Sequence, residues 1–190
     1  GDNLIIPDNE FPSNAYPWLH LAGRGVETRR VATDGNEVDL NRLAEAIDER
    51  TRLISISWVG YTTGHRTDLG ELVELAHGRN VLVCIDAIQG LGVFPLDVVS
   101  SGVDFAVADG HKWMLGPEGA GLFYLKREHL GLLRPIQIGW NSVVHWQDYA
   151  NLVLDLQPTA VRYEGGTANT PGILGLGASC RTHPRIGCTL

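Results

Sequence analysis

The sequence predicts an α/β fold: a mostly parallel, open β-sheet with flanking helices. Short, continuous apolar runs at residues 81–85 and 105–108 are typical of parallel strands that are covered on both faces. Amphipathic helical patterns at residues 39–47 and 68–78 alternate with such runs. The order strand, helix, strand builds an open sheet with right-handed crossovers, and 190 residues suffice for one domain of this kind.

A helix and a strand form the first unit that the pattern defines. At residues 39–47 the apolar side chains fall on one helical face, and Asp39 is suited to cap the first turn. A strand is expected at residues 52–59, followed by a loop rich in Gly and Thr at residues 60–66. This unit begins the expected alternation.

A second helix and strand follow directly. Asp68 and Glu71 lie three residues apart, as in a capping box, at the start of the helix expected at residues 68–78. The apolar strand at residues 81–85 comes next and is closed by Asp86. Asp86 therefore stands at the carboxyl end of a buried strand.

The later part of the chain is less regular. The strand at residues 105–108 is closed by the string Asp-Gly-His-Lys, and a further strand is expected at residues 121–125. Residues 131–163 are mixed in character, and no element is assigned there. Pro171 suits the first turn of a helix that would span residues 171–178.

Composition and charge exclude several classes of protein. The formal net charge is −7 and no run of Lys or Arg forms a stripe, so no nucleic-acid partner is expected. The apolar runs are short and the first residues lack the pattern of a signal peptide, so we expect no membrane association and a cytoplasmic location. Three cysteines are too few, and odd in number, for a disulfide framework.

Two residues at strand ends, Asp86 and Lys112, carry the functional prediction. Ligands of open α/β sheets bind outside the carboxyl ends of the strands, where both residues stand. A carboxylate can pair with a protonated ring nitrogen and a lysine amine can condense with an aldehyde, and pyridoxal 5'-phosphate (PLP) carries these two groups at opposite ends of one ring. Lys112 is therefore the predicted catalytic residue, holding PLP as a Schiff base and moving the Cα proton of an amino acid. The only other lysine, Lys126, is expected to be a solvated surface charge.

Three segments around these residues resemble a known family. They are Ile-Asp-Ala-Ile-Gln-Gly at residues 85–90, Val-Asp-Phe-Ala-Val-Ala-Asp-Gly-His-Lys at 103–112 and Gly-Pro-Glu-Gly-Ala-Gly at 116–121. In this order and spacing they resemble the class V aminotransferases of PLP-dependent fold type I, which include cysteine desulfurases, selenocysteine lyases and isopenicillin N epimerase-like proteins. The resemblance implies the large-domain portion of a PLP-dependent transferase or lyase that acts on a small-molecule amino acid.

The resemblance also implies roles for individual residues. Asp86 would bind the pyridine nitrogen, Gln89 would donate to the phenolic oxygen, and Lys112 would form the Schiff base. His111 would lie beside the phosphate or the Schiff base. Thr167, in a Gly-Gly-Thr string, would reach the cofactor phosphate of a neighbouring subunit, which implies a homodimer with shared sites.

Two positions depart from the family pattern. Asp109 stands where many relatives have a Ser or Thr that bonds the phosphate, and a carboxylate there would repel that dianion. Either Asp109 turns away or the phosphate is held differently. Tyr61 stands near a position where many relatives carry an Asn that approaches the ring, and its hydroxyl could still donate a hydrogen bond.

Two other hypotheses stay open beside this one. In the first, the chain is a truncated, catalytically inactive fragment that retains only the fold core, because the phosphate-binding turn and the aromatic residue that stacks on PLP are expected before the point where this sequence begins. The second is a metal hydrolase, whose ligands would be Asp86, Asp109, His65 and His111. It is disfavoured because these residues lack metal-ligand spacing, and Cys180, His183 and Cys188 match no common zinc pattern, so no metal is expected.

The sequence suggests a boundary near Ser179. Residues 1–178 are interpreted as a partial PLP-binding large domain, without the small C-terminal domain of the family. Residues 179–190 form an atypical tail, in which Pro184 and two arginines stand where an apolar helix should continue, at a cost of roughly 3 kcal/mol for an interior proline. The hypothesis is a frameshift or truncation near Ser179.

Overall fold

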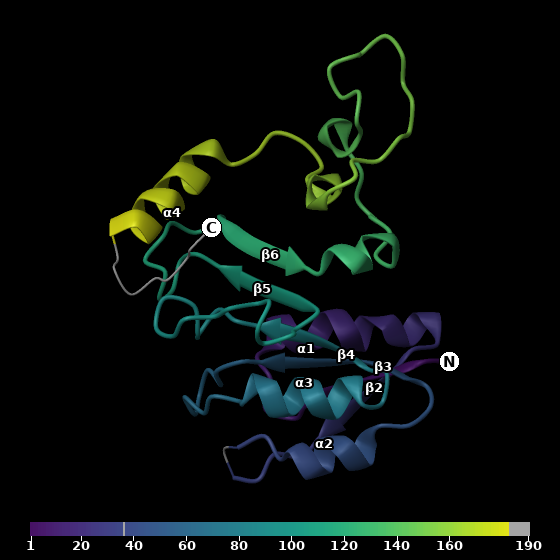
Figure 1. Ribbon diagram of the computed structural model, residues 1–190, viewed down its shortest axis with the longest axis vertical. Coiled ribbons are helices and arrows are strands. Elements are labelled where there is room, and N and C mark those ends of the chain that lie inside the picture. The colour runs from purple at the N-terminus through teal and green to yellow at the C-terminus, as the bar shows by residue number, and fades with distance from the viewer. Residues whose placement is uncertain (36, 183–190) are drawn as a thin grey trace.

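The computed structural model describes residues 1–35 and 37–182, and its centre is one six-stranded sheet in the order β2-β1-β3-β4-β5-β6 (Figure 1). Neighbouring strands are parallel except for β6, which pairs antiparallel with β5. The strands are β1 (Asn3–Pro7), β2 (Glu27–Val31), β3 (Thr51–Ser57), β4 (Leu82–Asp86), β5 (Phe105–Asp109) and β6 (Gly121–Leu125). The expected class, a mostly parallel open sheet with flanking helices, is confirmed.

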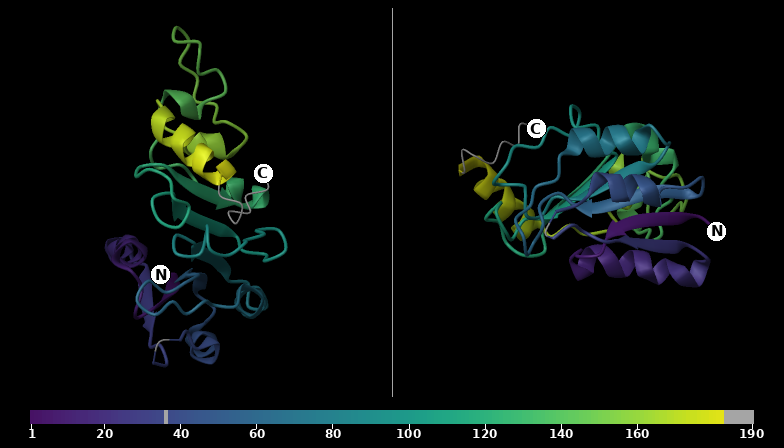
Figure 2. Two further views of the ribbon diagram at one scale, coloured as in Figure 1. Left: turned by 90° about the vertical axis from the view of Figure 1, so that its left-hand side faces the viewer. Right: turned by 90° about the horizontal axis from the view of Figure 1, so that it is seen from below.

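Helices cover both faces of the sheet. Figure 2 shows α1 on one face, with α2 and α3 on the opposite face. The α-helices are α1 (Pro12–Leu19), α2 (Leu40–Ala46), α3 (Leu69–His77) and α4 (Thr170–Thr182). The 3-10 helices are η1 (His20–Arg24), η2 (Arg127–Gly131), η3 (Trp140–Ser142) and η4 (Ala160–Tyr163). No helix of the described residues is both long enough and apolar enough to cross a membrane.

The core lies between the sheet and the helices α2 and α3. The inner strands of the sheet contribute fully buried apolar side chains to this core. Full burial of one such side chain stabilises the fold by about 1.5–3 kcal/mol. The helices contribute Leu43, Leu72 and Ala76, which are 0% exposed. The buried strand residues of this cluster include Ile5, Ile54, Ile56, Val83 and Ile85. The amphipathic pattern predicted at residues 68–78 is confirmed, because one face of α3 is buried.

Both predicted helix caps are present. The carboxylate of Asp39 accepts hydrogen bonds from the backbone N–H groups of Asn41 and Arg42, and that of Asp68 accepts one from Glu71. Each bond satisfies a donor that the first turn of a helix leaves without a partner. The helices therefore begin at the residues that the sequence indicated.

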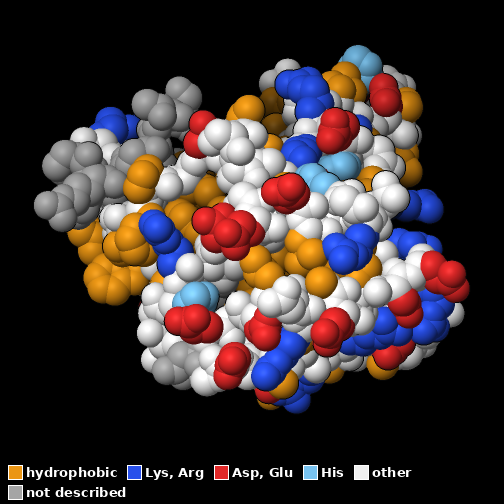
Figure 3. Space-filling view, turned by 60° about the horizontal axis from the view of Figure 1, so that its bottom comes forward, with side chains coloured by type: hydrophobic (Ala, Val, Ile, Leu, Met, Phe, Trp, Pro, Cys, Tyr) orange, Lys and Arg blue, Asp and Glu red, His pale blue; other side chains and the backbone are white. Residues whose placement is uncertain are grey.

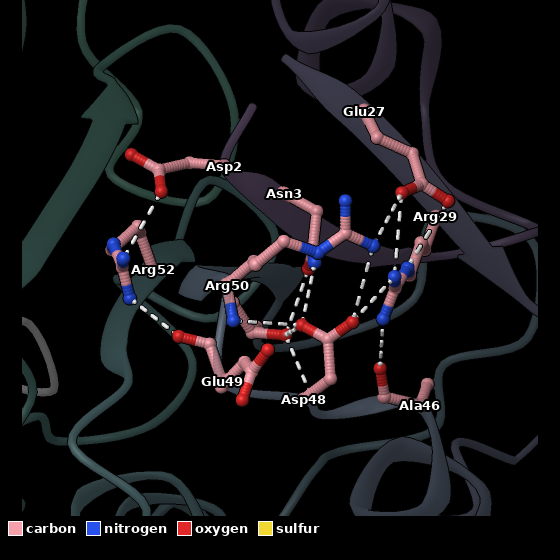
Figure 4. Close-up of polar contacts among 10 residues, drawn as sticks. Asp2, Asn3, Glu27, Arg29, Ala46, Asp48, Glu49, Arg50 and Arg52 are labelled. Atoms are coloured by element: carbon pink, nitrogen blue, oxygen red, sulfur yellow. Dashed lines mark hydrogen bonds and ion pairs between the residues drawn. The ribbon is translucent and has the colours of Figure 1, made fainter.

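A polar network joins the strands at the amino edge of the sheet (Figure 4). Asp48 accepts hydrogen bonds from the side chains of Asn3 on β1 at 2.8 Å and Arg29 on β2 at 2.7 Å. It also accepts one from the backbone N–H of Arg50, just before β3. The bonds from Asn3 and Arg29 hold the pKa of Asp48 well below its usual range. One carboxylate thus ties the starts of three strands together.

Lys126 is a structural residue, and the expectation of a solvated surface charge is wrong. Its amine donates to Asp104 at 3.0 Å, and the Asp104 side chain is only 2% exposed. The rings of His77 and His129 contact the same carboxylate at 2.8 and 2.9 Å. The Asp104 cluster, formed by Asp104, Lys126, His77 and His129, therefore links β5 to α3 and η2.

The chain between β6 and α4 extends away from the sheet as an arm (Figure 1). It contains η3 and η4, joined by irregular chain. Helix α4 continues to Thr182, past the proposed boundary at Ser179. Pro184, on which the interpretation of the tail depends, lies outside the described residues, so that boundary stays a prediction.

Acidic and basic side chains are interleaved over the face shown in Figure 3. Hydrophobic side chains gather on this face toward the side where α4 lies. Those of α4 that are more than half exposed are Ile173 and Leu174. The expected lack of a nucleic-acid partner stays a prediction.

Candidate functional site

The carboxyl ends of the parallel strands meet at one edge of the sheet and bring several polar residues together. Ser57 ends β3, Asp86 ends β4 and Asp109 ends β5. Ser57 and Asp86 are direct partners in the strand register, so their side chains project from the same face. Glu10 follows β1 at the same edge. This edge is where ligands of open α/β sheets bind.

A tight turn after β5 holds Lys112. The Gly110 N–H donates to the carbonyl of Ala120, the Gly116 N–H donates to that of Gly110, and the Leu115 N–H donates to that of Lys112, at 2.8–2.9 Å. A Cβ at Gly110 would lie 2.7 Å from the Ala120 oxygen, so this position requires glycine. The turn therefore fixes the backbone from which the lysine projects.

Helix α4 supports this turn from outside. Ser179 donates a hydrogen bond from its hydroxyl to the carbonyl of Met114 at 2.6 Å. Leu176 is 7% exposed and packs where a side chain at Gly110 or Gly116 would otherwise stand. The position of Lys112 thus depends on a helix far away in the sequence.

Asp86 is a half-buried carboxylate with room for a further partner. One oxygen accepts a hydrogen bond from the backbone N–H of Ile88 at 3.0 Å. Burial raises the pKa of Asp86, against the lowering effects of the Ile88 bond and the positive charge of Lys112. Asp86 forms no ion pair among the described residues, so its second oxygen is available to a ligand.

The amine of Lys112 faces an aromatic ring. Its Nζ lies 5.4 Å from the centroid of the Phe11 ring, and Lys112 forms no ion pair within the described part of the chain. The rings of Phe11 and Tyr61 pack edge to face with their centroids 5.1 Å apart. Sequence reasoning missed Phe11. The available signal was its position, an aromatic residue between the first strand and a proline that begins a helix.

Gln89 and His111 contact residues close to Lys112 in the sequence. Trp113 donates its indole N–H to the amide oxygen of Gln89 at 2.9 Å, which leaves the amide N–H groups of Gln89 as donors. Nδ1 of His111 lies 3.3 Å from Oδ1 of Asp109, although the two atoms are not aligned for a hydrogen bond. Asp109 therefore lies beside His111, and whether it turns away from a phosphate stays a prediction.

An open groove of about 650 Å³ lies at this edge. Asp86 and Asp109 line it together with Ser13 of α1. Tyr163 and Glu164, at the end of η4, also line it. The groove is large enough for a ring-sized ligand beside Asp86.

Three other candidates lie farther from this group. Thr167 is exposed between η4 and α4, and the hydrogen bonds of the described residues do not connect it to Asp86 or Lys112. Tyr61 contacts the ring of Phe11 and lines a small cavity next to Glu10. His65 lines a small cavity that it shares with Glu10. Among the described residues, no group of three His, Cys, Asp or Glu side chains could hold a metal ion, and His183 and Cys188 lie outside them.

Glu10 is a second carboxylate that sequence reasoning did not identify. It accepts hydrogen bonds from the backbone N–H of Ser57 at 2.5 Å, from the Ser57 hydroxyl at 2.7 Å and from the Asn14 amide at 3.0 Å. Burial raises its pKa, and the negative charge of Asp86 raises it further. No local pattern distinguishes this glutamate, because only the sheet brings Ser57 to it.

Comparison with known proteins gives consistent results. The family model described as Aminotransferase class-V matches residues 1–189. The "Probable cysteine desulfurase" of Methanothermobacter thermautotrophicus is 37% identical over 188 residues, which cover 98% of this chain and 46% of that protein. The crystal structure of the Escherichia coli cysteine desulfurase CsdA has a TM-score of 0.86 and 29% identity, covering 96% of this chain and 45% of CsdA.

A second solved structure is more similar still in its backbone. A variant of C-DES, with glycine covalently linked to its PLP cofactor, has a TM-score of 0.90 and 28% identity. The match covers 98% of this chain and 50% of C-DES. The chain thus spans about half the length of the relatives it matches.

Proposed function

The chain belongs to the class V aminotransferase family, and from this premise we propose that it forms the cofactor-holding part of a PLP-dependent transferase or lyase. Lys112 would hold the cofactor covalently, and the substrate would be an amino acid. The observation that carries the proposal is that the Asp86 carboxylate and the Lys112 amine follow neighbouring strands at one sheet edge, and neither forms an ion pair among the described residues.

The residues at this edge fit PLP at its ring. The available oxygen of Asp86 suits a protonated ring nitrogen, because a buried carboxylate favours a cationic partner. The ring of Phe11, 38% exposed and facing Lys112, suits one face of a flat heterocycle. Phe11 would thus be the stacking residue that was expected to precede this chain.

Each side chain would have a separate task. PLP, when bound, supplies an electron-withdrawing ring that stabilises negative charge at the substrate Cα. Asp86 would keep the ring nitrogen protonated, and a Gln89 N–H would donate to the phenolic oxygen. The Lys112 amine, once released by the substrate, would move the Cα proton as a general base. Phe11 would exclude water from one face.

The phosphate end is less complete in this chain. Asp109 does not fit a phosphate ligand, because its carboxylate would repel the dianion. We propose that Asp109 instead orients His111, the side chain 3.3 Å away. Thr167, which is exposed, would reach the phosphate of a neighbouring subunit, so the active form would be a homodimer.

The relatives support an amino acid as the substrate. CsdA and the Methanothermobacter protein are named cysteine desulfurases, and C-DES is named a cystine C-S lyase. A sulfur-containing amino acid is therefore the first substrate to test. The cytoplasmic location expected from the sequence is part of the same proposal.

Covalent labelling tests the proposal. We expect the purified chain, mixed with PLP and reduced with borohydride, to carry the label on Lys112 in a peptide map. Lys112→Arg should abolish the label, whereas Lys126→Arg should keep it, because arginine preserves the ion pair with Asp104. Label on Lys126, or none at all, would support the inactive fragment instead.

A further inference from the structure

Glu10 is held rigidly beside the proposed ring-nitrogen end of the site. Its two carboxylate oxygens accept three hydrogen bonds, two from Ser57 and one from Asn14. Asn14 is itself fixed, since its amide oxygen accepts from the Ser55 hydroxyl at 2.8 Å. The carboxylate of Glu10 is therefore anchored to β3 and to α1 at once.

This anchoring sets Glu10 next to Asp86. Ser57, which binds Glu10, is the direct register partner of Asp86 on the neighbouring strand. The charge of Asp86 acts on Glu10, so the two carboxylates lie within electrostatic range of each other. Neither forms an ion pair with an Arg, Lys or His among the described residues. Two half-buried acids thus lie at neighbouring strand ends, and neither is in an ion pair within the described part of the chain.

Two such carboxylates together favour a proton or a cation between them more strongly than one does. We propose that Glu10 is a positioning residue for the cofactor: acting through Asp86, it increases the proton affinity of the pyridine nitrogen. This inference rests on the proposed function. Glu10 does not touch the substrate. Its negative charge adds to that of Asp86, so that the pyridine nitrogen stays protonated to a higher pH.

The other titratable groups around Glu10 are few. Asp86 faces it from β4, and His65 and Tyr61, in the loop after β3, line the small cavity beside it. The Lys112 amine lies 5.4 Å from the centroid of the Phe11 ring, and Phe11 is the next residue after Glu10. As pH falls through the raised pKa of Glu10, the glutamate becomes neutral and its effect on the ring nitrogen disappears. A purely structural bridge from Glu10 to Ser57 would leave the protonation of the ring nitrogen unchanged.

Three variants separate the effect of the negative charge of Glu10 from the effect of its hydrogen bonds. Glu10→Gln removes the charge and keeps the size of the side chain. Ser57→Ala removes one hydrogen bond to Glu10 and keeps the charge. Glu74→Gln, at an exposed position on α3, is the matched control for the loss of one negative charge.

The experiment compares PLP dissociation constants from pH 5 to pH 9, together with the 15N shift of bound [15N]PLP. We expect Glu10→Gln to weaken PLP binding about tenfold at pH 8, which corresponds to about one unit in the pKa of the ring nitrogen, and the difference to shrink toward pH 5. Ser57→Ala should lower thermal stability and shift PLP binding less than threefold. Glu74→Gln should match the wild type.

The outcomes are distinguishable. If Lys112 is labelled in the wild type but Glu10→Gln binds PLP and shifts its 15N signal as the wild type does, this inference is overturned and the proposed function stands. A binding loss that is the same at pH 5 and pH 8 also overturns it, in favour of a structural role. If the wild type carries no label on Lys112, both proposals fail.

Discussion

Phe11 offers the simplest test of a single residue in the site. Its ring faces the amine of Lys112 and is 38% exposed, so it contributes more to a ligand than to the core. We expect Phe11→Ala to weaken PLP binding by about two- to tenfold, which corresponds to the 0.5–1.5 kcal/mol of an aromatic contact. An absorbance titration with PLP measures this.

Phe11→Leu is the control for the apolar volume of this side chain. Leucine covers a similar area without a ring, so its binding should fall between those of the wild type and Phe11→Ala. Equal dissociation constants for all three proteins would show that the ring does not contact the cofactor.

The sequence predicted site residues only where strand ends and motifs lie together. Asp86 and Lys112 were predicted because each follows an apolar strand, and both lie at the expected edge. Their roles, and those of Gln89 and His111, remain predictions. Glu10 follows a strand that was assigned no function, and it acquires Ser57 as a partner only when β1 pairs with β3.

At the scale of the elements, the Asp104 cluster is a test of stability. Burial alone would raise the pKa of Asp104, but hydrogen bonds from His77, His129, the Val83 N–H and Lys126 outweigh it and lower the pKa to about 2. Its ordinary value is 3.8, so the stabilisation is fully present above about pH 4 and is lost as pH falls toward 2. We expect about 2 kcal/mol from this group at neutral pH.

Asp104→Asn should therefore lower the free energy of unfolding by about 2 kcal/mol at pH 7, and by less as the pH falls below 4. Urea unfolding at several pH values measures this. Glu128→Gln is the matched control, because Glu128 lies 4.0 Å from His129 but is 72% exposed and should change stability by less than about 0.5 kcal/mol. A difference that does not depend on pH would contradict the role assigned to the Asp104 carboxylate.

For elements with strong local patterns, the predicted first and last residues lie within one or two residues of those in the structure. Helices α2 and α3 begin at the predicted caps, and β6 has the predicted bounds. Strand β2 was not predicted, because its sequence, Glu-Thr-Arg-Arg-Val, has no apolar run. It is an edge strand that pairs with β1 alone and is held by the bonds of Arg29 to Glu27 and Asp48. Such a strand depends on its neighbours and not on its own pattern.

At the scale of the whole molecule, the proposed sharing of sites predicts complementation between subunits. Lys112→Ala and Thr167→Ala should each label poorly at limiting PLP. When the two variants are mixed, refolded together and reduced, about a quarter of the sites should combine an intact Lys112 with an intact Thr167 from the other chain. Peptide mapping of the label then measures the restored fraction.

Sedimentation velocity on the same mixture supplies the control. A dimer with no restored label would place Thr167 outside the shared site. A monomer at every concentration would contradict the dimer itself.

The sequence by itself determined the α/β class, the two capped helices and the positions of Asp86 and Lys112 at strand ends, because each of these depends on residues that are neighbours in the chain. Only the tertiary structure decided that Phe11 faces Lys112, that Glu10 stands beside Asp86 and that Lys126 belongs to a buried ion cluster. These contacts join residues far apart in the sequence. Their geometry follows from the register of the strands, which no local pattern specifies.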